Sequence, residues 1–136
     1  MNHVFISYSR EDRQYVEELA KYLGDSGFPV WFDYRIETGD DWALKIEQAI
    51  SSSAAFVVVM SGAAEKSKWV KREVFFAEGQ GKPVYPILLQ GKPWSFRLGD
   101  LQFEDVRGQS LPSKGFFKRL EENVTRQSEP CELEFH

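Results

Sequence analysis

Short, continuous runs of apolar residues recur along the chain, and each is followed by a segment in which apolar side chains return at helical spacing. The four strongest runs are HVFISYS (3–9), PVWFD (29–33), AAFVVVM (54–60) and KPVYPILL (82–89). Strands with one face in water alternate apolar and polar residues, whereas these runs predict strands covered on both faces. The pattern predicts an α/β fold, a flavodoxin-like three-layer sandwich with a central parallel sheet of four to five strands.

The segments between these runs carry the signals of capped helices. Ser9 and Asp12 resemble a capping box at the start of the first helix, and Asp40 or Asp41 is a candidate cap for the second. After residue 90 the signals weaken. LQFEDV (101–106) is predicted to be a short fifth strand, and Ser113 is predicted to cap a last helix. We expect one domain over residues 1–125, followed by a tail or the start of a linker over residues 126–136.

Composition excludes several classes of function. The net charge of −4 argues against direct binding of nucleic acid, so the basic cluster of Lys66, Lys68, Lys71 and Arg72 is interpreted as solvated helix surface. One cysteine and two histidines leave no thiolate metal site and no Ser/His/Asp triad. The chain has no apolar run of about 18 residues and no signal-peptide pattern, which predicts a cytoplasmic protein that does not enter a membrane.

One carboxylate is out of place in the segment KSKWVKREVFFAEG (66–79). At about 100° of turn per residue, the apolar residues of this helix share one face. Glu73 falls near the middle of that face, between Trp69 one turn before it and Ala77 one turn after it. Burying a carboxylate without compensation costs several kcal/mol, so this position needs an explanation. The helix follows the third strand, which places Glu73 beside the crevice where such sheets bind ligands.

Several functions known for this architecture require residues that this chain does not have. The third strand ends in Met60-Ser61, where a phosphorelay receiver needs an aspartate. The chain has no G-x-x-x-x-G-K-[ST] loop for a nucleoside triphosphate, and no G-x-G-x-x-G follows its first strand. Chemistry at the crevice would therefore depend on a carboxylate, hydroxyls, arginines and aromatic rings.

Five segments in order resemble a TIR domain (Toll/interleukin-1 receptor homology). Their sequence pattern resembles that of microbial TIR proteins more than that of animal adaptors. The segments are VFISYSRED (4–12), VWFD (30–33) with the loop RIETGDDW (35–42), IEQAISSSAAFVVVMS (46–61), SKWVKRE (67–73) and GKPVYPILL (81–89). Many TIR domains cleave NAD⁺ with a glutamate that lies four residues after a tryptophan. Trp69 and Glu73 match this W-x-x-x-E pattern, so the resemblance implies that Glu73 is the catalytic carboxylate. The loop carries Glu37-Thr38 before its glycine, where many TIR domains have a proline.

The resemblance also implies a set of substrate-binding residues. Strand-end residues would hold the ribose and phosphates, an indole ring would stack on nicotinamide or adenine, and the loop at 34–41 would gate the site. Each has an ordinary structural alternative: capping for the serines, core packing for Tyr8 and the tryptophans, and solvent exposure for Arg10. Glu11 and Asp12 are interpreted as helix-dipole residues. The predicted substrate-binding residues are Tyr8, Ser9, Arg10, Asp33, Arg35, Trp42, Ser61 and Trp69.

Three functions follow from these observations. The first is an NAD⁺ glycohydrolase that releases nicotinamide and forms ADP-ribose or a cyclic form, without a bound cofactor. Its expected partners are other TIR domains in a homo-oligomer or filament, and a fused or separate sensor domain, in antiphage or immune-type defence. The second is a non-catalytic TIR module that acts by homotypic association through the loop. The third is a nucleoside deoxyribosyltransferase-like enzyme, which has a related sheet and a glutamate that attacks a sugar.

Overall fold

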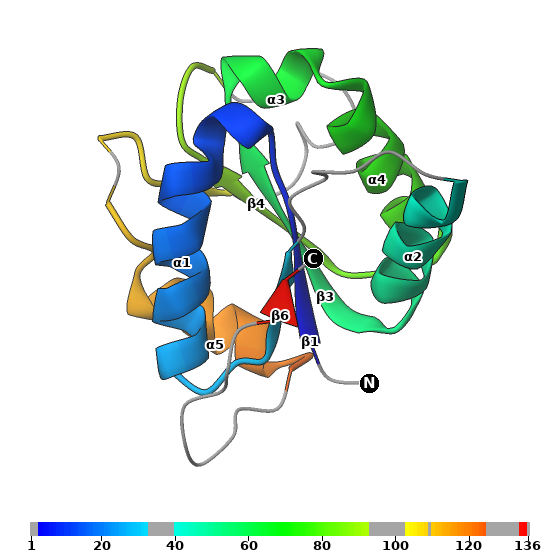
Figure 1. The fold of residues 1–136 in the computed structure, drawn as a ribbon. Coiled ribbons are helices and arrows are strands. Elements are labelled where there is room, and N and C mark those ends of the chain that lie inside the picture. The colour runs from blue at the N-terminus through cyan, green and yellow to red at the C-terminus, as the bar shows by residue number, and fades with distance from the viewer. Residues whose placement is uncertain (1–2, 33–39, 93–102, 109, 125–133, 136) are drawn as a thin grey trace.

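The computed structural model describes residues 3–32, 40–92, 103–108, 110–124 and 134–135, and the side chains of residues 40–43, 134 and 135 lie outside the description. Its centre is a six-stranded sheet in which every neighbouring pair is parallel (Figure 1). The spatial order is β5-β4-β3-β1-β2-β6. The strands are β1 (His3–Ser7), β2 (Val30–Phe32), β3 (Ser53–Met60), β4 (Val84–Leu88), β5 (Glu104–Asp105) and β6 (Glu134–Phe135).

This order confirms the flavodoxin-like sandwich, because its first five strands run 2-1-3-4-5 across the sheet. The sheet is one strand wider than the predicted four to five. The additional strand, β6, lies in the segment expected to be a tail or linker, where Trp31 pairs with Glu134 and Phe32 with Phe135. Both outermost strands, β5 and β6, have only two residues. Short edges of this kind limit the unpaired backbone that a sheet exposes.

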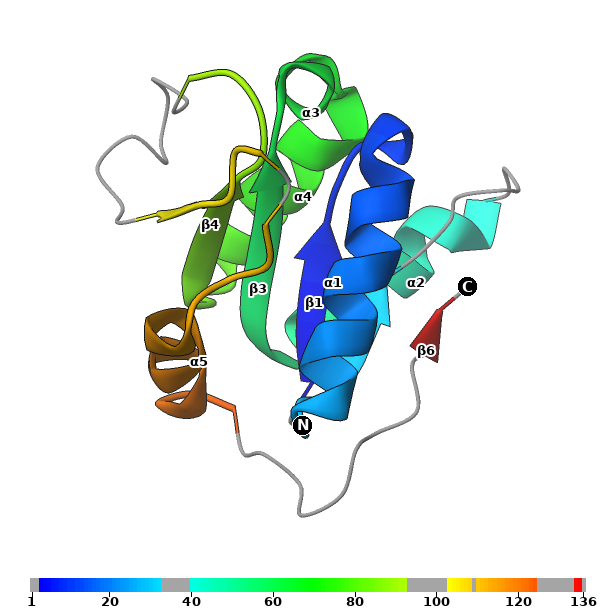
Figure 2. The same ribbon diagram turned by 90° about the vertical axis from the view of Figure 1, so that its left-hand side faces the viewer.

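Helices cover both faces of the sheet. In the side view, α1 stands in front of β1 and α4 lies behind the strands (Figure 2). α2 packs beside α4 on that second face. The segment predicted as one helix around Glu73 is divided at Ser67, which ends α3 and caps α4 by accepting a hydrogen bond from the Val70 amide at 3.2 Å. The helices are η1 (Arg10–Asp12), α1 (Arg13–Asp25), α2 (Asp40–Ser51), α3 (Gly62–Lys66), α4 (Lys68–Gly79) and α5 (Lys114–Glu121).

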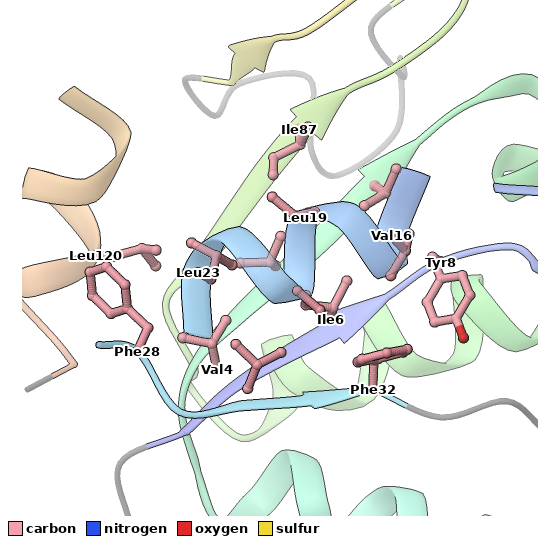
Figure 3. Close-up of a cluster of buried hydrophobic side chains, with 14 of the residues drawn as sticks. Val4, Ile6, Tyr8, Val16, Leu19, Leu23, Phe28, Phe32, Ile87 and Leu120 are labelled. Carbon is pink, nitrogen blue, oxygen red and sulfur yellow. The ribbon is translucent and has the colours of Figure 1, made fainter. Parts of the chain in front are cut away.

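Two separate apolar clusters form the core, one on each face. The first joins the sheet to α1 and α5 and contains Ile6, Leu19 and Leu120 (Figure 3). The second joins the opposite face to α2 and α4 and contains Phe5, Ile50 and Val74. Successive residues of β1 contribute to alternate clusters because their side chains point to opposite faces. The apolar runs of the sequence are thus explained by burial of both faces.

Three aromatic rings stack across the middle of the second cluster. Phe5 lies in register with Trp31 of β2 and Phe56 of β3. Its ring centroid is 4.9 Å from that of Trp31 and 5.6 Å from that of Phe56, with interplanar angles of 16° and 6°. This stack ties the three central strands together on the face that carries α4. Within the described part of the chain, no helix is both long and apolar enough to cross a membrane.

Candidate functional site

Glu73 is buried at the carboxyl end of β1. Its side chain lies on α4 and is only 3% exposed. The hydroxyl of Ser7, the last residue of β1, donates a hydrogen bond of 2.7 Å to Glu73 Oε1, and Ser7 is 1% exposed. The second carboxylate oxygen, Oε2, is buried as well. The structure therefore keeps a carboxylate inside the protein at the edge of the sheet where this fold binds ligands.

The helical pattern of α4 explains why Glu73 faces inward. Val70, Val74 and Ala77 are fully or almost fully buried and pack in the second cluster, and Glu73 shares their face. Trp69 lies at the rim of this face, since 42% of it is exposed. The basic residues are exposed: Lys68 and Lys71 lie on the side of the helix away from Glu73, Arg72 lies at the edge of the inner face, and Lys66 belongs to α3. This confirms the interpretation of the basic cluster as helix surface.

A pocket between α2 and α4 brings Trp69 and Glu73 to one wall. It is shallow, with about 240 Å³ of empty space that includes open solvent, and Ile46, Glu47 and Ile50 of α2 form its other wall. Arg72, which also lines it, pairs with Glu47 at 3.5 Å and holds its guanidinium 5.6 Å from the centroid of the Trp69 ring. The pocket surface is mainly apolar, with the Trp69 ring and the Arg72 side chain at one wall, and the Glu73 side chain lies in that wall with its carboxylate oxygens buried.

A second buried carboxylate joins two turns at the same edge of the sheet. Ser61, the residue after β3, donates a 2.5 Å hydrogen bond to Asp12 Oδ2 and caps α3 by accepting one from the Ala64 amide. Asp12 is 9% exposed and ends η1, the turn after β1. Burial raises the pKa of Asp12 above its ordinary value of 3.8, although the hydrogen bond from Ser61 opposes this rise. Asp12 and Ser61 thus connect the segments that follow β1 and β3.

The raised pKa of Asp12 predicts a pH dependence of stability. The folded protein binds this proton more tightly than the unfolded chain, so the contribution of Asp12 to stability is greatest below pH 3.8 and falls as pH rises through the folded-state pKa. Asparagine does not titrate. The free energy of unfolding of the wild type minus that of Asp12→Asn should therefore decrease with rising pH and then level off. Urea unfolding across the acidic range measures this difference, and an increase with pH would contradict the prediction.

The predicted binding residues lie in different environments in the structure: the core, a helix cap, the solvent-exposed surface and the pocket wall. Ser7 and Tyr8 point to opposite faces, and Tyr8 packs in the first cluster against Phe32, at 6.1 Å between ring centroids (Figure 3). Ser9 caps η1 by accepting from the Glu11 amide, and Arg10 is exposed on that turn. Among the predicted binding residues whose side chains the structure describes, Trp69 lines the pocket together with Glu73. Asp33, Arg35 and the side chain of Trp42 lie outside the described residues.

Two residues of this region went unrecognised as site residues in the sequence. Asp12 was interpreted as a helix-dipole residue, but its carboxylate is buried against Ser61. Its spacing of three, four and seven residues to the buried Tyr15, Val16 and Leu19 is a signal that could have placed it on the inner face. Ser7 lies within the run HVFISYS (3–9) that predicted the first strand, and that prediction gave it no role of its own. A hydroxyl inside an apolar run, on the same face as Phe5, was its only signal.

The chemistry of the pocket is that of one buried carboxylate, Glu73, close to the aromatic ring of Trp69. Among the residues that the structure describes, no three His, Cys, Asp or Glu side chains are grouped so that they could hold a metal ion. A buried carboxylate can stabilise a developing cation or accept a proton. A half-exposed indole ring can stack on a planar group, and a nearby guanidinium can pair with an anion.

Known proteins similar to this chain include microbial enzymes. The 2' cyclic ADP-D-ribose synthase BtTIR of Bacteroides thetaiotaomicron is 33% identical over 72 residues, which make up 52% of this chain and 25% of that protein. The NAD(+) hydrolase TcpA of Theionarchaea archaeon (strain DG-70-1) is 33% identical over 86 residues, which make up 60% of this chain and 26% of that protein. Most of the length of each relative thus lies outside the matched region.

Solved structures share the fold. The TIR domain of the Toll-related receptor TRR-2 from Hydra magnipapillata matches with a TM-score of 0.74 and 24% identity, covering 89% of this chain and 99% of that chain. The TIR domains of the activated Roq1 resistosome match with a TM-score of 0.60 and 23% identity, covering 90% of this chain and 72% of that chain. A family model described as TIR domain matches residues 4–121. The chain belongs to the TIR domain family.

Proposed function

We propose that this chain is an NAD⁺ glycohydrolase in which Glu73 is the catalytic carboxylate. The observation that carries the proposal is the position of Glu73: buried, held by Ser7 at the carboxyl end of β1, and lining one pocket with Trp69. A buried carboxylate is costly to keep, and no apolar packing requirement of α4 demands one. Burial of this kind is typical of functional residues. The names of the relatives, an NAD(+) hydrolase and a 2' cyclic ADP-D-ribose synthase, point to the same substrate.

The chemistry of NAD⁺ cleavage suits a single preorganised anion. The bond between C1' of the ribose and the nicotinamide nitrogen breaks, and its electron pair leaves with nicotinamide, which becomes neutral. Positive charge then develops on the ribosyl group. A fixed carboxylate next to this charge stabilises the transition state more than the ground state, as the carboxylates of glycosidases do. Glu73 could also bind the ribose hydroxyls.

The second half of the reaction determines the product. Attack of water on C1', with loss of one proton, gives ADP-ribose. Attack of a hydroxyl of the same molecule, also with loss of one proton, gives a cyclic form. In this proposal Glu73 accepts the proton in either case. One relative is named a 2' cyclic ADP-D-ribose synthase and another an NAD(+) hydrolase. The assay described below identifies which nucleotide this chain forms.

Substrate binding is proposed to use the pocket rim and the strand ends. The Trp69 ring offers a flat surface for nicotinamide or adenine, with Trp42 as a second candidate. Arg10 would pair with the pyrophosphate. Tyr8, Ser9 and Ser61 would approach the ribose and phosphates, and Asp33 and Arg35 belong to the loop proposed to gate the site. We further propose that activity requires association with other TIR domains, in a defence response that a sensor domain triggers.

Release of nicotinamide tests the proposal. Concentrated protein is incubated with NAD⁺, with and without a crowding agent, and nicotinamide is followed by chromatography. We expect nicotinamide and one nucleotide product, ADP-ribose or a cyclic form, to appear in equal amounts. Nucleosides supplied in place of NAD⁺ should remain intact. Cleavage of nucleosides alone would favour a deoxyribosyltransferase-like enzyme, and no cleavage of either substrate under crowding would favour the non-catalytic module.

A further inference from the structure

Ser7 and Glu73 lie 66 residues apart in the sequence but form one buried hydrogen-bonded pair. Ser7 ends β1, where its backbone is fixed by pairing with Val58 of β3. The hydroxyl has a single proton, and this proton is donated to Glu73 Oε1 over 2.7 Å. Both side chains are at least 97% buried, since they are 1% and 3% exposed. The contact is thus protected from water and attached to one of the two central strands of the sheet.

A glutamate side chain on a helix has three rotatable bonds, and a carboxylate that rotates is a poor electrostatic catalyst. Preorganised charges stabilise a transition state because they need no rearrangement during the reaction. A hydrogen bond from a rigid strand removes part of this freedom by fixing the direction of Oε1. The neighbouring hydroxyls have other roles: Ser61 bonds to Asp12 and Ser9 caps η1.

We propose that Ser7 is a positioning residue, whose hydroxyl fixes the Glu73 carboxylate in the orientation in which it acts on NAD⁺. This inference rests on the proposed function. In this role Ser7 acts through Glu73 and does not itself touch the reacting atoms. Its loss should therefore slow the chemical step and leave substrate binding nearly unchanged.

Steady-state kinetics of nicotinamide release test this role with three variants. Ser7→Ala removes the donor, and we expect kcat to fall about tenfold or more while KM stays within about twofold. Ser7→Thr restores a hydroxyl at the same position and should recover most of the lost kcat. Ser53→Ala is the matched control. Ser53 is also a buried strand serine, 4% exposed, but its hydroxyl bonds to the Ile50 carbonyl at 2.7 Å, at the opposite end of β3. Its kcat should equal that of the wild type.

Three outcomes would overturn the inference: an unchanged kcat in Ser7→Ala, an equal loss in Ser7→Ala and Ser53→Ala, or a rise in KM alone. An inactive wild type would overturn the proposed function and the positioning role together. A double-mutant cycle of unfolding free energies, with Ser7→Ala, Glu73→Ala and the double variant, separates this case from a failed contact, because Glu73→Ala removes the acceptor that glutamine would keep. Coupling in the cycle shows that the pair forms in solution, and no coupling overturns the inference whatever the activity.

Discussion

Glu73→Gln should release nicotinamide from NAD⁺ at least about a hundredfold more slowly than the wild type, because it removes the charge that stabilises the transition state. Glutamine has nearly the same shape, and its amide oxygen can still accept the hydrogen bond that Ser7 donates to Oε1. The fold should therefore persist. Replacing a buried charge by a neutral group should leave stability the same or raise it. Chromatography of nicotinamide measures the rate, and circular dichroism with urea unfolding checks the fold.

Glu78→Gln provides the control for this substitution. It removes one negative charge from the same helix, five residues further along, at a half-buried position outside the pocket lining. Nicotinamide release by Glu78→Gln should match that of the wild type. If Glu73→Gln cleaves NAD⁺ as fast as the wild type does, Glu73 is not the catalytic carboxylate, and the buried pair with Ser7 has a structural role only.

The sequence was sufficient to predict the architecture because burial on both faces leaves a pattern that can be read locally. The run at 54–60 is apolar throughout and the run at 82–89 is apolar after Lys82, and they became β3 and β4 of the sheet. The edges were harder to predict. Glu134–Phe135 forms β6 by pairing with β2, more than one hundred residues earlier, and two residues carry no periodicity that would reveal such a partner.

The site was predictable in part for a similar reason. Glu73 is visible in the sequence because one carboxylate interrupts an apolar helical face, and helical spacing is a local property. Its partner Ser7 was not predictable, since the contact joins a strand and a helix 66 residues apart. Asp12 and Ser61 meet across 49 residues in the same way. Sequence periodicity shows which way a side chain faces, but the tertiary fold determines which group it meets.

Phe5→Ala should destabilise the protein by about 3–5 kcal/mol, the cost typical of removing a large buried aromatic side chain. Phe5 is fully buried in β1, between the stacked rings of Trp31 and Phe56. Alanine would leave a cavity between β2 and β3 and would remove both ring contacts. Since small domains are stable by about 5–15 kcal/mol, this loss is a large share of the total. Urea unfolding at 25 °C measures it as a lower midpoint.

Phe75→Ala is the matched control, because the same side chain is removed from a position on α4 that is 62% exposed. Its effect should stay below about 1 kcal/mol, as is usual for surface substitutions. Equal midpoints for the two variants would contradict the packing described for the second cluster. The prediction also bears on the site, since Phe5 and Ser7 lie on the same face of β1 and the aromatic stack supports the strand that holds Glu73. Phe5→Ala should therefore lower activity in parallel with the folded fraction, whereas Ser7→Ala should lower kcat in a protein that remains folded.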